Sequence, residues 1–336
     1  MPKDELLMRK AIALAKRGCG KTSPNPAVGC LIVQRGKILG AGWHRRAGGP
    51  HAEVEALRSL KNISSARGAT VYVTLEPCST HGKTPPCTGA LITAGIARVV
   101  VGATDPNPKH RGRGLRLLLQ AGIKVDAGVL AGECAALNPE FNHFMTTGLP
   151  WVIAKCGMSL DGRLTRPRGE GPWITSLASR RDAMKLRARV DAILVGAATV
   201  RADDPALTLR GQALRGAGQP WRVVWAPRRL PPKSAQIFHD AERDRTIVLR
   251  DKSLRGVLKK LAARGILSVL VEGGGYTLGK LFDAGLASEV VFYIAPLLAG
   301  GAVPSVGGRG FRSEKLSSVR YAKLGPDLKV TGQISA

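Results

Sequence analysis

Four residues in the first ninety of this chain could together hold and use a metal ion. His51 is followed two residues later by Glu53, and two thiols come next in the pairs Pro77-Cys78 and Pro86-Cys87. One imidazole and two thiolates suit Zn²⁺, and three protein ligands leave its fourth tetrahedral position open to water. Water at such a site ionises near pH ~7 instead of ~15.7. The set therefore predicts hydrolytic chemistry, with Glu53 free to carry protons.

A structural zinc site is the alternative interpretation of two cysteines and one histidine. Structural sites are normally closed by a fourth protein ligand. No nearby Cys or His supplies that ligand as naturally as water does, so the sequence favours the open, catalytic kind of site.

The spacing between the two thiols narrows the class of enzyme. Zinc deaminases that act on nucleobases carry an H-x-E element and a P-C-x-x-C motif, with a Glu that is not a ligand as acid and base. Here eight residues, Ser79 to Pro86, separate Cys78 from Cys87. The string TLEPCSTHGKTPPC, from Thr74 to Cys87, closely resembles the deaminase half of the bifunctional riboflavin-biosynthesis deaminase/reductase family, and the resemblance continues through nearly the whole chain.

The second half of the chain resembles the reductase half of the same family. The segments that carry this likeness begin at Lys155 (KCGMSLDG), Trp173 (WITS) and Gly196 (GAATVRADDPALTLR). A strand-like run also ends in Glu272 and a glycine triplet, whose bare backbone amides and following helix suit a pyrophosphate. This turn is not G-x-G-x-x-G, and taken alone a mere tight turn would explain it at least as well.

The resemblance implies one site in each half of the chain. In the first half, Zn²⁺ would be held by His51, Cys78 and Cys87, with Glu53 as the catalytic acid and base. The substrate-binding residues there would be Asn25, His44, Lys83, Asp105 and Asn107. In the second half, NADPH would be bound by Gly157, Trp173, Thr199, Asp203, Gly273, Gly274 and Gly275, and the substrate by Gly171, Arg187, Leu207, Arg210 and Glu272. The candidates for a proton donor in the reduction are Lys155, Asp203 and Glu272.

Without the resemblance, several of these residues would have simpler roles. Asn25 and Asp105 would be turn residues beside prolines. Arg187 and Arg210 would be solvated cations in a basic chain, although guanidinium groups also form forked hydrogen bonds to a phosphate. Two residues depart from the family pattern. Thr80 stands where many relatives carry His, so any role of that imidazole is absent or passes to His81. Gly171 stands where relatives often carry Ser, which removes a hydroxyl that could touch substrate.

The elements around these residues are predicted to be alternating helices and strands. Helices are expected at 5–16, 51–60, 88–94 and 115–120, a hairpin at 28–33 and 37–41, and strands at 71–75, 99–102 and 123–125. Later strands are expected at 151–155, 192–195, 222–225, 246–249, 267–271 and 290–295, with weak order at 210–220. Together with the resemblance, this predicts a cytidine-deaminase-like α/β/α layered domain at 1–147 and a dihydrofolate-reductase-like α/β domain at 148–336.

The net charge of +27, from 51 Lys and Arg against 24 Asp and Glu, raises a second class of function. Such a balance favours polyanions, so an RNA-base deaminase or a nucleic-acid-binding protein with a degenerate second domain is the alternative. The basic residues are dispersed and form no nucleic-acid-binding module, which favours small phosphorylated ligands and no specific nucleic-acid partner.

Compartment and partners can also be predicted. The six cysteines do not form a disulfide scaffold, and no apolar run reaches the ~20 residues of a membrane span. We expect a cytoplasmic enzyme with a phosphorylated pyrimidine substrate and no membrane partner. The resemblance adds a homo-oligomer that assembles through the reductase half.

Overall fold

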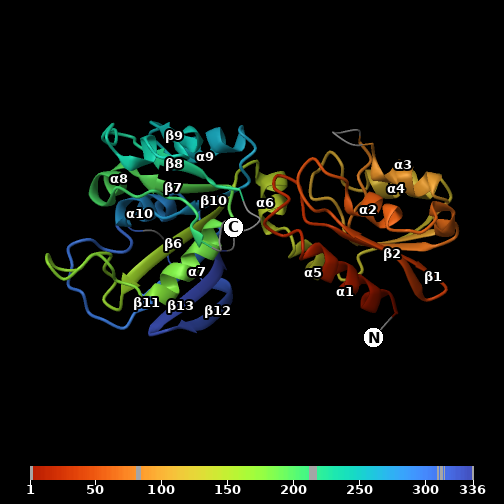
Figure 1. Cartoon of the computed structure of the whole chain (residues 1–336), viewed down its shortest axis with the longest axis horizontal. Helices are drawn as coiled ribbons and strands as arrows, with labels where there is room; N and C mark the ends of the chain where they lie inside the picture. Colours follow the sequence, from red (N-terminus) through yellow and green to blue (C-terminus); the bar gives the residue numbers. More distant parts are fainter. Residues whose placement is uncertain are drawn as a thin grey trace. The chain divides into compact units, whose positions relative to one another are not determined.

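The chain forms two compact units, residues 1–148 and 149–336. The computed structural model describes residues 3–80, 85–211, 218–308, 310, 313 and 315–334. Each unit is built around one β-sheet (Figure 1). Every helix in these described ranges is too short or too polar to cross a bilayer. The segment 210–220, for which weak order is expected, lies largely outside the described residues.

The first unit has a five-stranded sheet in the order β2-β1-β3-β4-β5. β1 pairs antiparallel with β2 and β3, whereas β3, β4 and β5 run parallel. The strands are β1 (Gly29–Gln34), β2 (Lys37–Trp43), β3 (Thr70–Leu75), β4 (Arg98–Ala103) and β5 (Lys124–Ala127). The helices are α1 (Lys3–Ala15), α2 (Ala52–Arg58), η1 (Ile63–Ala66), α3 (Cys87–Thr93), α4 (Arg113–Gln120), α5 (Ala131–Ala135) and α6 (Pro139–Thr147).

Side chains that alternate along β3 and its neighbours fill two cores. Val71 and Val73 face a core that they share with α2, α3 and α4, whereas Tyr72 faces a second core shared with α1 and α5. This period of two is the pattern of a strand buried on both faces. The helices accordingly cover both faces of the sheet (Figure 1), which confirms the α/β/α layered class expected for this half.

The second unit has an eight-stranded sheet in the order β12-β13-β11-β6-β10-β7-β8-β9. The run from β11 to β9 is parallel, and β13 and β12 add antiparallel strands at one edge. The strands are β6 (Trp151–Ser159), β7 (Ala192–Gly196), β8 (Trp221–Trp225), β9 (Thr246–Leu249), β10 (Ser268–Val271), β11 (Glu289–Ala295), β12 (Leu316–Leu324) and β13 (Asp327–Ile334). The helices are α7 (Leu177–Arg187), α8 (Ala197–Asp203), η3 (Gln236–Phe238), η4 (Arg243–Arg245), α9 (Leu254–Ala262) and α10 (Gly275–Asp283).

This sheet is also covered on both faces. Val152 and Ala154 of β6 pack into the core under α9 and α10, and Ile153 between them packs into the core under α7 and α8. In such sheets ligands bind beyond the carboxyl ends of the parallel strands. The glycine triplet follows β10 at that end, and Gly196 ends the neighbouring strand β7.

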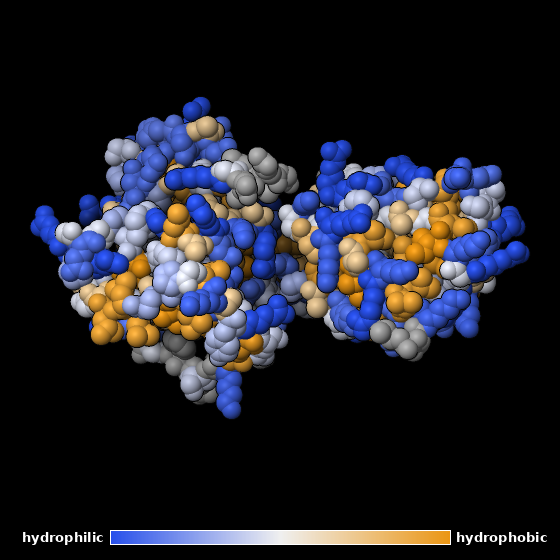
Figure 2. All heavy atoms as spheres, turned by 60° about the horizontal axis from the view of Figure 1, so that its bottom comes forward, coloured by the Kyte–Doolittle hydropathy of each residue, from blue (hydrophilic) through white to orange (hydrophobic). Residues whose placement is uncertain are grey.

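Some of the basic side chains have local partners, in both units. Arg45 lies over the ring of Trp43 at 4.1 Å, and Arg180 lies over that of Trp173 at 4.3 Å. On the face shown in Figure 2, hydrophilic side chains cover both units and are interleaved with apolar ones. The arginines therefore include several that are engaged locally, in keeping with the dispersed charge expected from the sequence.

Candidate active sites

Three elements of the first unit bring the predicted metal ligands together. His51 is the N-cap residue of α2, Cys78 follows β3, and Cys87 is the first residue of α3. His51 Nδ1 lies 3.4 Å from Cys78 Sγ and 3.3 Å from Cys87 Sγ. The three ligand atoms all lie within 4.8 Å of one another, so one ion can contact all three.

The spacing of these atoms fits zinc. With Zn–S near ~2.3 Å and Zn–N near ~2.0 Å, a tetrahedral site places nitrogen and sulfur about 3.5 Å apart. The two observed nitrogen–sulfur distances of 3.4 and 3.3 Å agree with this value. Within the described part of the chain, no fourth His, Cys, Asp or Glu joins the group. The described donors are therefore one imidazole and two thiols, which is the donor set of a zinc site with three protein ligands.

The pKa values of the two thiols are shifted in opposite directions, and Cys78 is the one that ionises. The pKa of Cys78 is lowered to about 4, first by the hydrogen bond from the Cys87 thiol and then by the one from His51. The Cys87 backbone N–H also donates to Cys78 Sγ over 3.3 Å. The pKa of Cys87 is raised, because its proton lies between two sulfurs. A negative charge is thus held on Cys78 where the metal would bind.

Glu53 lies beside the ligands without being one of them. Its side chain points into the unit and the residue is only 3% exposed. The carboxylate is within hydrogen-bonding reach of the Cys87 thiol. Burial raises the pKa of Glu53 to about 7. This places an acid–base group beside the metal set, next to the Cys87 ligand, in keeping with the H-x-E spacing.

Asn25 and His44 form one polar pair next to the metal set. The rings of His44 and His51 are arranged edge to face, with centroids 5.3 Å apart. Burial lowers the pKa of His44, so its ring is neutral. His44 Nδ1 lies 2.8 Å from the Pro50 carbonyl and therefore carries the proton, which leaves Nε2 to accept from Asn25 Nδ2 at 3.1 Å.

Asp105 and Asn107 are turn residues, as their proline neighbours suggest. Asp105 Oδ1 accepts from the Asn107 N–H over 2.8 Å, and Asn107 Oδ1 accepts from the Lys109 N–H over 3.0 Å. Their role toward substrate stays a prediction. Lys83, the remaining substrate-binding residue expected in this unit, lies outside the described residues.

Glu76 is a residue of this site that the sequence reasoning missed. Its buried carboxylate accepts three backbone N–H groups, from Asp105 at 3.1 Å and from Gly112 and Gly114 at 2.9 Å each. A Cβ at Gly114 would lie 2.2 Å from the Pro77 carbonyl oxygen, so this loop packs directly on the segment that leads to Cys78. Glu76 thereby holds the loop of Asp105 and Asn107 against the metal set. Its position directly after a buried strand was the available signal.

Glu76→Gln is expected to weaken substrate binding in the first unit without loss of zinc. An amide keeps only one acceptor oxygen for three donors, and a hydrogen bond to a charged group contributes about 1.5–3 kcal/mol. We expect KM for the substrate of this unit to rise about tenfold or more, measured by the ammonia release that the sequence resemblance predicts, with zinc content unchanged. Glu133→Gln, in an exposed pair with Arg9, is the control. Loss of zinc in the Glu76 variant would instead place its role at the metal ligands.

The glycine triplet of the second unit has one open position. A Cβ at Gly273 would meet Thr277 Cβ at 2.4 Å, and one at Gly275 would meet the Pro304 carbonyl oxygen at 2.1 Å. Both glycines are therefore required by packing inside the unit. At Gly274 the nearest atom to a Cβ would be Thr199 Oγ1, at 3.6 Å. The sequence suggested that the backbone of all three glycines is accessible to a ligand. In the structure this holds only for Gly274, the N-cap residue of α10.

Other residues expected to bind NADPH lie near the same strand ends. Thr199, in the first turn of α8, accepts from the Gly274 N–H over 3.3 Å. Gly157 of β6 faces Thr175, since a Cβ there would lie 3.2 Å from Thr175 Cγ2. Trp173 is 59% exposed, Asp203 is exposed at the end of α8, and Gly171 has a φ of 90° that favours glycine.

Arg187 is not the free phosphate-binding fork expected from the sequence. Its Nε and Nη2 atoms donate to the two oxygens of Glu272 over 2.8 and 2.7 Å, and both side chains are largely buried. Burial alone would raise the pKa of Glu272, but Lys155 and Arg187 outweigh it and lower that pKa to about 2. Glu272 is thus ionised at neutral pH, which removes it from the candidates for proton donor in the reduction.

Leu207 and Arg210 lie on the segment after α8. The Leu207 side chain is 3% exposed and packs in the core under α7 and α8, so this side chain does not face a ligand. Leu207 also has a φ of 53°, in the left-handed region. Arg210 is exposed. Any substrate contact by Leu207 would therefore use its backbone.

Comparisons with known proteins match both halves of the chain. The family described as the cytidine and deoxycytidylate deaminase zinc-binding region matches residues 1–103, and the RibD C-terminal domain matches residues 150–330. Among curated proteins, riboflavin biosynthesis protein RibD of Escherichia coli is 45% identical over 88% of this chain and 89% of its own length. RibD of Bacillus amyloliquefaciens is 41% identical over 98% of this chain and 95% of its own.

Solved structures show the same likeness over the full length. Acinetobacter baumannii RibD has a TM-score of 0.91 and 37% identity, with 99% of each chain covered. A Thermotoga maritima diaminohydroxyphosphoribosylaminopyrimidine deaminase/5-amino-6-(5-phosphoribosylamino)uracil reductase has a TM-score of 0.85 and 34% identity, again with 99% of each chain covered.

Proposed function

Because this chain belongs to the RibD family of bifunctional riboflavin-biosynthesis enzymes, we propose that its two units divide the two reactions of that family between them. The chain is a zinc-dependent deaminase and an NADPH-dependent reductase. Residues 1–147 would deaminate 2,5-diamino-6-(5-phosphoribosylamino)pyrimidin-4-one. Residues 148–336 would then reduce the ribosyl side chain of the deaminated product to ribityl phosphate. The observation that carries this proposal is the grouping of His51, Cys78 and Cys87 beside the buried Glu53.

In the first unit, the side chains divide the work of deamination. His51, Cys78 and Cys87 would hold zinc, which supplies a water activated at neutral pH. The Glu53 carboxylate takes up the proton of the attacking water and passes it to the departing amino group. Asn25 donates to His44 through Nδ2, so its Oδ1 is the atom left to accept from the pyrimidine. The anchored loop of Asp105 and Asn107 would form another wall of the substrate site.

In the second unit, the residues bind and orient. NADPH supplies the hydride for the reduction. Gly274 would let the backbone approach the cofactor closely, and Thr199 fixes the Gly274 amide from the next helix. Arg210, which is exposed, would bind the substrate phosphate. With Glu272 held as a carboxylate, Lys155 and Asp203 are the remaining proton-donor candidates.

Assembly and location extend the proposal. The enzyme acts on a small phosphorylated pyrimidine, and we propose that copies of the chain associate through the second unit. In support, the edge strand β12 exposes Tyr321 and Val319, and edge strands pair readily with other chains. A cytoplasmic location and the lack of a specific nucleic-acid partner stay predictions.

Gly274→Ala is expected to stop the reaction sequence at the deaminated intermediate. The new methyl group meets no atom of the described residues closer than 3.6 Å, so we expect the fold to be kept, but it occupies the space where the cofactor would approach. When the full chain is incubated with the diaminopyrimidine ribosyl phosphate and NADPH, product masses should show ribityl phosphate for the unaltered protein and mainly unreduced product for the variant. NADPH affinity, from fluorescence quenching, should fall about tenfold or more.

Gly132→Ala is the matched control, since a Cβ there meets no atom of the described residues within 4 Å and the residue lies in the first unit. It should leave both product masses unchanged. Unaltered NADPH affinity and reduction in the Gly274 variant would remove this turn from the cofactor site. Zinc-free protein that still releases ammonia would overturn the zinc dependence proposed for the deamination.

A further inference from the structure

The segment from Asp204 to Arg210 has neither helix nor strand, yet its backbone is tied down along its length. At its start, Asp204 accepts the Gln236 N–H through Oδ1 over 2.9 Å, and the Gln236 side-chain amide donates to the Asp204 carbonyl. Near its middle, Leu207 adopts a φ of 53°. A left-handed backbone conformation at a bulky residue such as leucine costs free energy, and it persists only where the surrounding contacts impose it. The question is which residues impose it.

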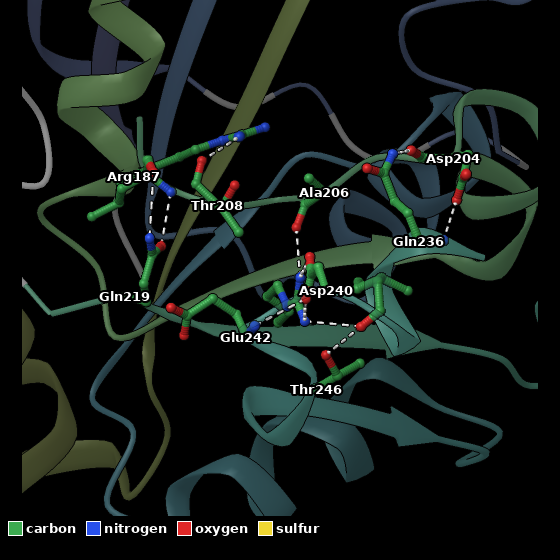
Figure 3. Close-up of polar contacts among 12 residues, drawn as sticks. Arg187, Asp204, Ala206, Thr208, Gln219, Gln236, Asp240, Glu242 and Thr246 are labelled. Carbon is green, nitrogen blue, oxygen red and sulfur yellow. Dashed lines mark hydrogen bonds and ion pairs between the residues drawn. The ribbon is translucent and has the colours of Figure 1, made fainter. Parts of the chain in front are cut away.

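Arg222 fixes the carbonyl immediately before Leu207. This residue lies on β8 and is only 1% exposed. Its Nη1 donates to the Ala206 carbonyl over 2.9 Å, while Nη2 donates to the Ile237 carbonyl and to Asp240 Oδ1, each over 2.8 Å. Figure 3 shows Ala206 and Asp240 meeting at one guanidinium group. The ion pair with Asp240 therefore holds the buried guanidinium group of Arg222 in the orientation in which it donates to the Ala206 carbonyl.

Gln219 fixes the backbone on the other side. The Leu209 N–H donates to Gln219 Oε1 over 2.8 Å, and Gln219 Nε2 donates to the Leu209 carbonyl over 3.3 Å. The Thr208 carbonyl, between the two anchors, lies 3.4 Å from Arg187 Nη1 (Figure 3). Leu207 is thus enclosed by bonds at Ala206, Thr208 and Leu209. These bonds set the direction in which the chain enters Arg210.

We propose that Arg222 and Gln219 are positioning residues of the reductase reaction. They hold the backbone from Ala206 to Leu209 in the conformation that presents the Leu207 backbone and the Arg210 side chain to the ribose phosphate. The inference rests on the proposed function in one respect, the assignment of Leu207 and Arg210 to the substrate. Neither anchor contacts substrate itself. Both act through main-chain groups of a segment without helix or strand. A small displacement of that segment should weaken substrate binding without disturbing the packing of the core.

Arg222→Lys and Gln219→Leu test this role. Lysine offers one compact ammonium, which cannot reach Ala206, Ile237 and Asp240 together as the planar fork does. Leucine removes both bonds to Leu209, and since Gln219 is half-buried this variant keeps the fold even where a change at Arg222 does not. For each variant we expect KM for the deaminated pyrimidine phosphate to rise about tenfold, with KM for NADPH unchanged within about twofold. Ammonia release by the first unit should be unaltered.

Two further variants make the outcomes decisive. Thr246→Val removes a 3.1 Å bond to the Ile237 carbonyl on the far side of the network, so it should leave KM for the pyrimidine unchanged. Arg210→Met should raise that KM, and if it does not, the assigned substrate contact fails and the inference with it. If Arg210→Met raises KM while both anchor variants leave it unchanged, only the positioning role is overturned. An equal change in KM for NADPH and for the pyrimidine would show a merely structural role and also overturn it.

Discussion

Glu53→Gln is expected to abolish deamination while the protein keeps its zinc. The amide has nearly the shape of the carboxylate, so it fits a site where the residue is only 3% exposed. It cannot take up a proton at neutral pH. A positioned acid–base group contributes about 10²–10⁴ in rate, and we expect ammonia release to fall by that factor. Metal content, measured on the same sample, should stay equal to that of the unaltered protein because the ligand group does not include Glu53.

Glu55→Gln is the matched control for this experiment. Glu55 lies on the same helix, but its carboxylate is paired with Arg45 over 3.0 Å. The control should retain both activities. The Glu53 variant should still oxidise NADPH when it is given the deaminated intermediate, because its change is confined to the first unit. Zinc loss together with retained ammonia release would contradict the role assigned to Glu53.

The metal set could be predicted from the sequence because its chemistry is carried by residue types. Imidazole, thiolate and carboxylate differ from every neighbouring side chain, and their order in the chain is that of a known class of zinc deaminases. The loop anchors Glu76, Arg222 and Gln219 could not be found in this way. Each binds main-chain groups of a segment elsewhere in the chain, and every residue supplies such groups. Their partners become visible only when the fold brings the segments together.

The strands in the cores were predictable for a similar reason. β3, β4, β7 and β8 are rich in β-branched residues and buried on both faces, so their sequences are nearly continuous apolar runs. The terminal strand β12 was not expected, because it lies at the sheet edge and most of its residues are exposed. Helices α5 and α6 were missed as well. They are short and separated by Ala136-Leu137-Asn138, so neither shows enough turns for a periodic pattern.

For Arg187, residue type and family resemblance did not predict the partner that the side chain has in the structure. A guanidinium group can bind a phosphate, but here Arg187 forms a bidentate ion pair with Glu272, whose side chain is 9% exposed. Taking two charges out of water is costly, and their mutual attraction offsets that cost only while both are present. Lys155 adds a second cation that acts on Glu272. The single negative charge of this carboxylate is therefore stabilised by two cations, of which only Arg187 forms an ion pair with it.

Glu272→Gln is expected to destabilise the second unit more than Arg187→Met. Loss of one partner of a buried pair costs about 3–5 kcal/mol. After Glu272→Gln, Arg187 and Lys155 are both left without their anion, so this variant belongs at the upper end of that range. After Arg187→Met, Glu272 still has Lys155, so that variant belongs at the lower end. Reduction should fall in both variants, and ammonia release in neither.

Urea unfolding followed by tryptophan fluorescence measures this difference, because Trp151, Trp173, Trp221 and Trp225, four of the five tryptophans, lie in the second unit. The pKa of Glu272 is lowered from 4.5 to about 2, so its contribution is complete above pH 4.5 and is lost as the pH falls toward about 2. The gap in unfolding free energy between the unaltered protein and Glu272→Gln should narrow over that interval. A gap independent of pH, or an Arg187 variant less stable than the Glu272 variant, would mean that packing and not charge makes this pair necessary.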